Sequence, residues 1–137
     1  MNVIVRVSLA LIAGLVLIAC DWLDRGISGA PPDAAGRYPD VIAVELQPSG
    51  DGVYDVAVTI SSPYDTPERY ADGWRVLDPV GNVLGTHTLL HDHAGEQPFT
   101  RTQRGLAIPE GVAQVTVEGR DRANGFGGAT VTVDVPT

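Results

Sequence analysis

The sequence predicts an all-β protein, an antiparallel β-sandwich of about seven short strands that follows an N-terminal signal segment and a flexible tether. Two observations carry this prediction. From Asp40 onward, apolar and polar residues alternate in short runs rich in Val, Ile and Thr, which is typical of half-buried strands. Turn-forming Gly, Pro, Asn and Asp separate these runs at intervals of roughly 8–15 residues, and no segment carries the apolar stripe of a helix.

The expected strands are residues 41–46, 53–61, 73–77, 83–90, 97–103, 113–118 and 130–135. Turn-rich connections are predicted at residues 48–52, 62–72, 78–82, 108–111 and 119–128.

Period-two alternation predicts which side chains face the core, because successive residues of a strand point to opposite faces. Val56, Val58 and Ile60, together with Tyr54, are expected on one face of the second strand. Trp74 and Val76 are expected on the buried face of the third strand. Val115 and Val117 of the sixth strand are expected to face Val131, Val133 and Val135 of the last strand.

A tryptophan on the third strand, Trp74, resembles the core tryptophan of immunoglobulin-like domains. The number, length and spacing of the strands in residues 40–137 likewise resemble an Ig-like or fibronectin type III-like sandwich. The inter-sheet disulfide and the tyrosine corner of antibody domains are absent, which excludes a true antibody domain. The resemblance implies a fold and no ligand.

The N-terminus has the layout of a secretory signal, with Arg6 before an apolar run that ends at Leu17-Ile18-Ala19-Cys20. This run is shorter than the roughly 20 apolar residues that a membrane span needs. The Leu-Ile-Ala-Cys ending resembles the lipobox of bacterial lipoproteins. The resemblance covers residues 1–20 and implies cleavage before Cys20 and lipid attachment to its sulfur, including an acyl chain such as palmitate. The alternative is an uncleaved N-terminal anchor helix.

The resemblance therefore divides the chain into a signal peptide at 1–19, a lipidated cysteine and tether at 20–39, and one sandwich domain at 40–137. It also implies a location in the cell envelope, attached to a membrane through lipid. In enterobacterial lipoproteins an aspartate after the cysteine resembles a signal for retention in the inner membrane. Asp21 therefore favours the periplasmic face of that membrane.

Removal of residues 1–19 takes away one basic residue, Arg6, and leaves 17 acidic against 8 basic residues, a net charge of −9. A surface of this charge repels phosphate backbones, so no nucleic-acid partner is expected. An envelope protein is a possible partner, and the sequence leaves the oligomeric state open.

Three histidines, His87, His91 and His93, lie close together in the sequence, with Glu96 beside them. If the fourth strand continued past Leu90, the three imidazoles would share one face, and such a set suits Zn²⁺ or Cu²⁺. The alternative is that the strand has ended and the histidines lie in a turn or in the core, with no cofactor. Both interpretations stay open at this stage.

The glycine-rich loop 121–128 offers a second candidate site, formed by Asp121, Asn124 and Phe126. Phe126 is either the exposed contact of a binding hairpin or a side chain that packs over the sandwich edge while Asp121 caps the turn. Oxygen ligands in this loop could take Ca²⁺, although their spacing matches no EF-hand.

The sequence contains no Gly-x-Ser-x-Gly elbow, no phosphate-binding loop and no cysteine apart from Cys20. We therefore predict a non-catalytic binding or structural lipoprotein. A metal-binding lipoprotein is the alternative. A hydrolase is a third possibility, because catalytic triads assemble from residues distant in sequence. A packed core of short strands is expected to leave little room for a cleft.

Overall fold

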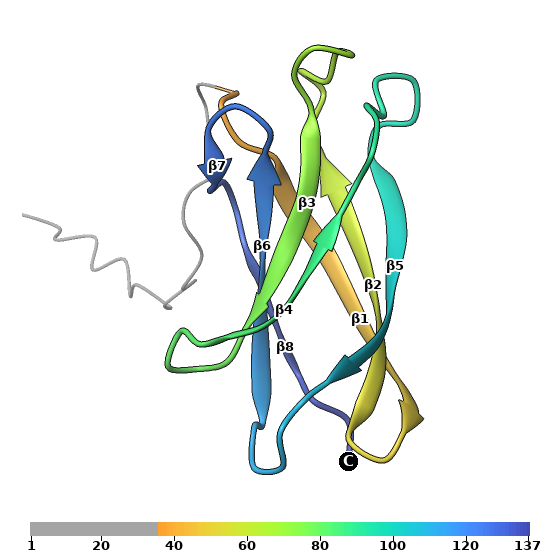
Figure 1. Cartoon of the computed structure of the whole chain (residues 1–137), viewed down its shortest axis with the longest axis vertical. Helices are drawn as coiled ribbons and strands as arrows, with labels where there is room; N and C mark the ends of the chain where they lie inside the picture. Colours follow the sequence, from red (N-terminus) through yellow and green to blue (C-terminus); the bar gives the residue numbers. More distant parts are fainter. Residues whose placement is uncertain (1–35) are drawn as a thin grey trace, which may run out of the picture.

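The computed structural model describes residues 36–137, which form two antiparallel sheets packed face to face, with no helix among these residues (Figure 1). The predicted fold class, an all-β antiparallel sandwich, is confirmed. The predicted signal peptide 1–19, Cys20 and tether residues 21–35 lie outside the described residues.

The described strands are β1 (Asp40–Gly50), β2 (Val53–Ser61), β3 (Ala71–Leu77), β4 (Val83–Thr88), β5 (Phe99–Ala107), β6 (Gln114–Asp121), β7 (Gly125–Phe126) and β8 (Val131–Asp134). One sheet has the order β1-β2-β5 and the other the order β4-β3-β6, with β7 and β8 both paired to the free side of β6. In constant-type immunoglobulin domains the fourth strand joins the sheet of the first, second and fifth. Here β4 pairs with β3 instead, so the chain has a different arrangement of the same sandwich.

The core lies between the sheets, and the predicted faces account for most of it. In β2, Val56, Val58 and Ile60 are each 0% exposed, whereas the residues between them are half-buried. Trp74 is also buried, and its indole N–H donates to Gln103 Oε1 at 3.0 Å. This bond satisfies the one polar atom that the indole brings into the core.

Several predicted boundaries are wrong, each for a local reason. β1 continues through Pro48 to Gly50 because it is an edge strand, where a residue without an N–H is tolerated. β4 ends at Thr88, two residues before the predicted end at Leu90, and the last contact with β3 is the hydrogen bond from Leu89 N–H to Asp72 O at 2.8 Å.

The two-residue strand β7 lies inside the predicted loop 119–128, and β6 extends to Asp121. β5 covers residues 99–107 rather than 97–103, and it includes a register shift opposite Tyr54 and Val56. The two sheets together therefore have eight strands in the described residues, where about seven were predicted.

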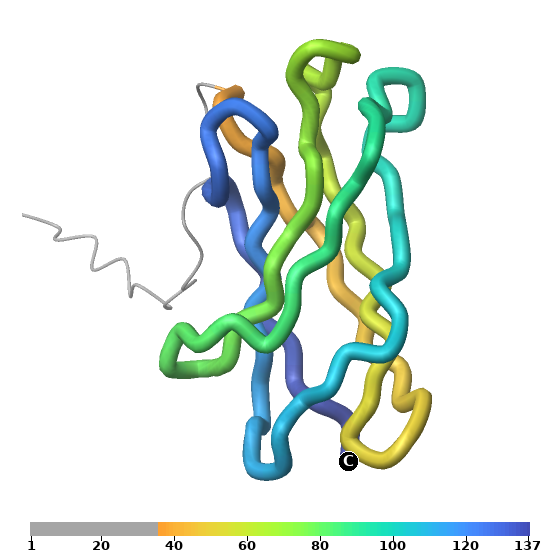
Figure 2. The backbone as a smooth tube through the Cα atoms, in the orientation of Figure 1, coloured from red at the N-terminus to blue at the C-terminus, as the bar shows by residue number. Residues whose placement is uncertain are grey.

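The strands run between two ends of the sandwich, which Figure 2 shows as two groups of loops. The N-terminal pole consists of residues 36–39, 62–70, 89–98 and 122–124. The C-terminal pole consists of residues 51–52, 108–113 and 135–137. The nine residues of β2 join the two poles and span about 30 Å at 3.3 Å per residue.

Candidate functional site

The segment that leads into β1 packs closely against two glycines, Gly127 and Gly128, at the N-terminal pole. Pro39 is fully buried. A Cβ at Gly128 would overlap the Pro39 carbonyl oxygen, and a Cβ at Gly127 would lie 2.6 Å from the Tyr38 ring. Only residues without a side chain allow this close approach. The packed unit therefore includes residues 36–39, the last four residues of the predicted tether.

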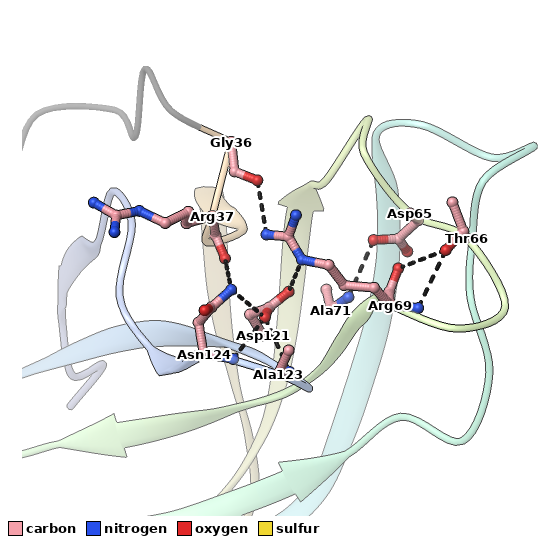
Figure 3. A network of polar contacts seen from close by, with 9 residues as sticks. All are labelled: Gly36, Arg37, Asp65, Thr66, Arg69, Ala71, Asp121, Ala123 and Asn124. Carbon is pink, nitrogen blue, oxygen red and sulfur yellow. Dashed lines mark hydrogen bonds and ion pairs between the residues drawn. The ribbon is translucent and has the colours of Figure 1, made fainter.

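The carboxylate of Asp121 is the centre of the polar network at this pole (Figure 3). Its side chain is fully buried, and its Oδ1 accepts the backbone N–H groups of Ala123 at 3.0 Å and Asn124 at 2.8 Å. The Asn124 amide donates to the same oxygen at 2.8 Å. Arg69 Nε lies 3.3 Å from Oδ2. The Asp121 carboxylate therefore caps the turn before β7. Such a cap was one of the two interpretations of this loop that the sequence allowed.

The same network holds the entering segment. Arg69 Nη2 donates to Gly36 O at 2.8 Å, and Asn124 Nδ2 donates to Arg37 O at 3.1 Å. Both contacts appear in Figure 3, where Arg69 and Asn124 flank Asp121 beneath the incoming chain. A buried carboxylate therefore connects the start of the domain to the loop between β6 and β7.

Two further side chains extend this network to the neighbouring loops. Asp65 is buried and accepts the N–H of Ala71 and the N–H of His93, each at 3.0 Å. Burial, and then the nearby Asp121 carboxylate, raises the pKa of the Tyr64 phenol, which stays neutral. The Arg69 guanidinium lies 4.3 Å from the centre of the Tyr64 ring. Asp65 thus connects two further segments of this pole, whereas Tyr64 Oη and His93 Nδ1 are buried without a hydrogen-bond partner among the described residues.

The three histidines do not form a ligand set. His87 stacks on Trp74, with ring centroids 4.3 Å apart, and burial lowers its pKa. His93 is buried against Phe99 at 3.9 Å, and its ring centroid lies 4.7 Å from that of His91.

Glu96, the fourth predicted ligand, pairs with Arg101 at 2.7 Å. Within residues 36–137, no group of three His, Cys, Asp or Glu side chains could hold a metal ion. The shared face required the fourth strand to continue past Leu90, and that premise is wrong because β4 ends at Thr88.

The loop residues Asp121, Asn124 and Phe126 also make internal contacts. Phe126 is half-buried, and the guanidinium of Arg75 lies 4.1 Å from the centre of its ring. Arg120 Nε lies 3.6 Å from Asp72 Oδ1. The described geometry fits the interpretation in which Phe126 packs over the sandwich edge.

A pocket of about 700 Å³ opens at the C-terminal pole, although the packed core of short strands was expected to leave little room for a cleft. Its wall is mostly apolar, since Ile108 is buried and Tyr54, Val112 and Val135 are half-buried. The lining residues are Asp51, Gly52, Tyr54, Ile108, Pro109, Glu110, Gly111, Val112, Ala113, Val135, Pro136 and Thr137. The volume lies within the range of about 300–1,000 Å³ that small-molecule sites occupy.

Backbone hydrogen bonds fix the three segments that surround this pocket. Ile108 N donates to Gly52 O at 2.9 Å, and Val135 N donates to Ala113 O at 2.8 Å. The Tyr54 hydroxyl donates to Pro136 O at 3.0 Å. The segments are far apart in sequence, so no local motif predicts the pocket. Of the parts that form it, the sequence predicted turns only at 48–52 and 108–111.

No protein-family model matches this chain, and no solved structure matches it. A protein of Halomicrobium mukohataei named "Putative lipoprotein" is 38% identical to it over 98 residues, which make up 72% of this chain and 48% of that protein. The chain therefore spans about half the length of this relative. Its similarity to a protein with that name supports a lipoprotein of unknown role.

Across residues 36–137 there is no helix of the length and apolar character that crossing a bilayer requires.

Proposed function

We propose that this chain is a cell-envelope lipoprotein, held at a membrane by lipid on Cys20, whose β-sandwich serves there as a non-catalytic binding module. Two independent observations support the anchor. Leu17-Ile18-Ala19-Cys20 ends an apolar run of signal-peptide length, and a relative that is 38% identical over 98 residues is named "Putative lipoprotein". Attachment by two or more acyl chains is stable, whereas one chain alone is marginal.

The observation that carries the binding role is the placement of the pocket relative to the entering chain. Residues 36–39 are fixed at the N-terminal pole, which is the side nearer to Cys20 along the chain. The pocket opens at the opposite pole, about 30 Å away along β2. A domain anchored through its N-terminus would present this pocket away from the bilayer.

A non-catalytic role agrees with the chemistry of the pocket. Its lining contains two carboxylates, Asp51 and Glu110, and no His, Cys, Ser or Lys side chain. The Ser–His and Cys–His pairs of covalent acyl transfer are thus not among the lining residues. The sandwich is a rigid scaffold, and its loops supply the surface that recognises a ligand.

The anchor is tested by expressing the full chain in its native host and comparing Cys20→Ser with Ser28→Ala, a matched change in the same segment. Intact-mass spectrometry of the membrane fraction should show wild type and Ser28→Ala as chains that begin at Cys20 and carry added lipid. Cys20→Ser should lack that mass. The proposal is wrong if Cys20→Ser keeps both the wild-type mass increment and the wild-type distribution between membrane and soluble fractions.

A further inference from the structure

We propose that the pocket at the C-terminal pole binds a small organic cation with an apolar body. The inference rests on the proposed binding role of the sandwich but not on the lipid at Cys20. Its test therefore fails or succeeds separately from the test of the anchor.

The apolar part of the ligand follows from the walls of the pocket. Tyr54, Val112 and Val135 remain half-buried and line a space of about 700 Å³. Ile108 is 5% exposed and lies at the edge of the main core. Apolar surface that the fold leaves open is covered favourably by an apolar ligand. The volume admits a ligand of one or two rings rather than a single ion.

The charge of the ligand follows from the rim. Asp51, at the β1–β2 turn, and Glu110, between β5 and β6, are both exposed and both line the pocket. Neither forms an ion pair with another residue of the described range 36–137. No lining residue is basic, and the whole chain carries a net charge of −8. The rim therefore attracts a cation and repels an anion.

The ring of Tyr54 adds to the preference of the pocket for a cation. Tyr54 is the one aromatic residue among the lining residues, and its hydroxyl is tied to Pro136 O at 3.0 Å. This bond fixes one end of the side chain and leaves the ring beside the pocket. Tyrosine rings attract quaternary ammonium groups, which hold a positive charge on an apolar body. The apolar body of such a cation would contact the apolar walls, and its positive charge would lie near the carboxylates of the rim.

The experiment titrates the full chain, in nonionic detergent, with benzyltrimethylammonium and separately with phenylmethanesulfonate, which has the same ring and the opposite charge. Backbone amide shifts in NMR spectra report where each probe binds. The cation should shift the amides of Gly52, Tyr54 and Val112 saturably, and the anion should bind at least about tenfold more weakly.

Charge variants separate a site from a general effect of net charge. Asp51→Asn/Glu110→Gln should weaken cation binding by about tenfold or more. Glu45→Gln/Glu68→Gln removes the same charge from exposed positions outside the pocket and should leave binding unchanged. Val112→Trp fills the pocket at constant charge and should abolish the shifts. If Val112→Trp fails to fold, as circular dichroism would show, the two charge variants still decide the question.

Four outcomes overturn the inference: no saturable shift, equal binding of cation and anion, shifts outside the C-terminal pole, or equal weakening by both charge variants. Concentration-dependent association through this pole in the absence of probe would also overturn it, by assigning the pocket to a second copy. Cys20→Ser should bind the cation as wild type does, because the pocket lies within the described domain.

Discussion

The acidic side chains at the two poles of the sandwich differ in burial and in hydrogen bonding. At the N-terminal pole, Asp121 and Asp65 are buried and accept hydrogen bonds from backbone N–H groups. At the C-terminal pole, Asp51 and Glu110 stay exposed on the rim of an apolar pocket. A carboxylate that fixes a loop must be satisfied internally, whereas one that recognises a ligand must stay free to pair with it. The contrast agrees with a stabilising N-terminal pole and with the recognition role that we propose for the C-terminal pole.

The largest expected effect tests the stabilising role of the N-terminal pole. Asp121→Ala leaves the Arg69 guanidinium and the N–H groups of Ala123 and Asn124 without their acceptor. We expect the free energy of unfolding to fall by about 4 kcal/mol, because Asp121 accepts three hydrogen bonds and a bond to a charged group is worth about 1.5–3 kcal/mol. Urea denaturation followed by circular dichroism measures it.

The matched control is Asp51→Ala at the C-terminal pole, where the carboxylate is exposed and a surface substitution should stay within about 0.5 kcal/mol of wild type. Equal losses in the two variants would remove the distinction between the poles.

A pair of glycines provides the second comparison, because Gly128 and Gly111 have nearly the same backbone conformation, with φ of 81° and 88°. An alanine at either position should cost about 1–2 kcal/mol for its left-handed backbone. At Gly128 the Cβ also overlaps Pro39 O, whereas at Gly111 it meets nothing within 4 Å. Gly128→Ala should therefore destabilise by at least about 1 kcal/mol more.

The same urea titration distinguishes the two variants. If the free energy of unfolding falls as much in Gly111→Ala as in Gly128→Ala, the close approach of Pro39 to Gly128 adds no cost beyond backbone strain.

The sequence predicted the strands well where burial alternates regularly. The β2 strand was predicted at its observed bounds, and Val115 and Val117 pair with Val133 and Val131 as expected. In these strands the period-two pattern arises directly from one face packing on the core. The end of the fourth strand was missed because Leu89 and Leu90 look alike in sequence, although only Leu89 is buried.

The sites were predicted only where their contacts are local. Asp121 as a turn cap could be predicted, since its partner Asn124 is three residues away. Asn124 also reaches Arg37 across 87 residues, and no pattern encodes that contact. The pocket likewise depends on three segments that meet only after the sheets pack. Chain topology, rather than local composition, creates both features.

A smaller effect concerns pH. Burial, with the charges of Arg101 and His91 adding to it, lowers the pKa of His93 below its ordinary 6.5. As pH falls below 6.5 the unfolded chain takes up the proton first, so this contribution to stability is complete above 6.5 and is lost toward the lower pKa of the folded state. We expect a slope of up to about 1.4 kcal/mol per pH unit.

Denaturation midpoints measured between neutral and mildly acidic pH should show a flatter profile for His93→Phe than for wild type. His87, whose pKa burial also lowers, keeps its own share of the slope. An unchanged profile in His93→Phe would exclude His93 as a source of acid sensitivity at the N-terminal pole.

The smallest expected effect tests the C-terminal pole alone. Tyr54→Phe removes the hydroxyl that donates to Pro136 O, a half-buried bond worth about 1 kcal/mol. The ring stays, so the apolar wall of the pocket is retained. Amide hydrogen exchange should accelerate near Pro136 and remain unchanged around Asp121. A fall in the free energy of unfolding as large as that in Asp121→Ala would show that the C-terminal pole also stabilises the fold. The open pocket would then be a consequence of packing rather than a surface kept free for recognition.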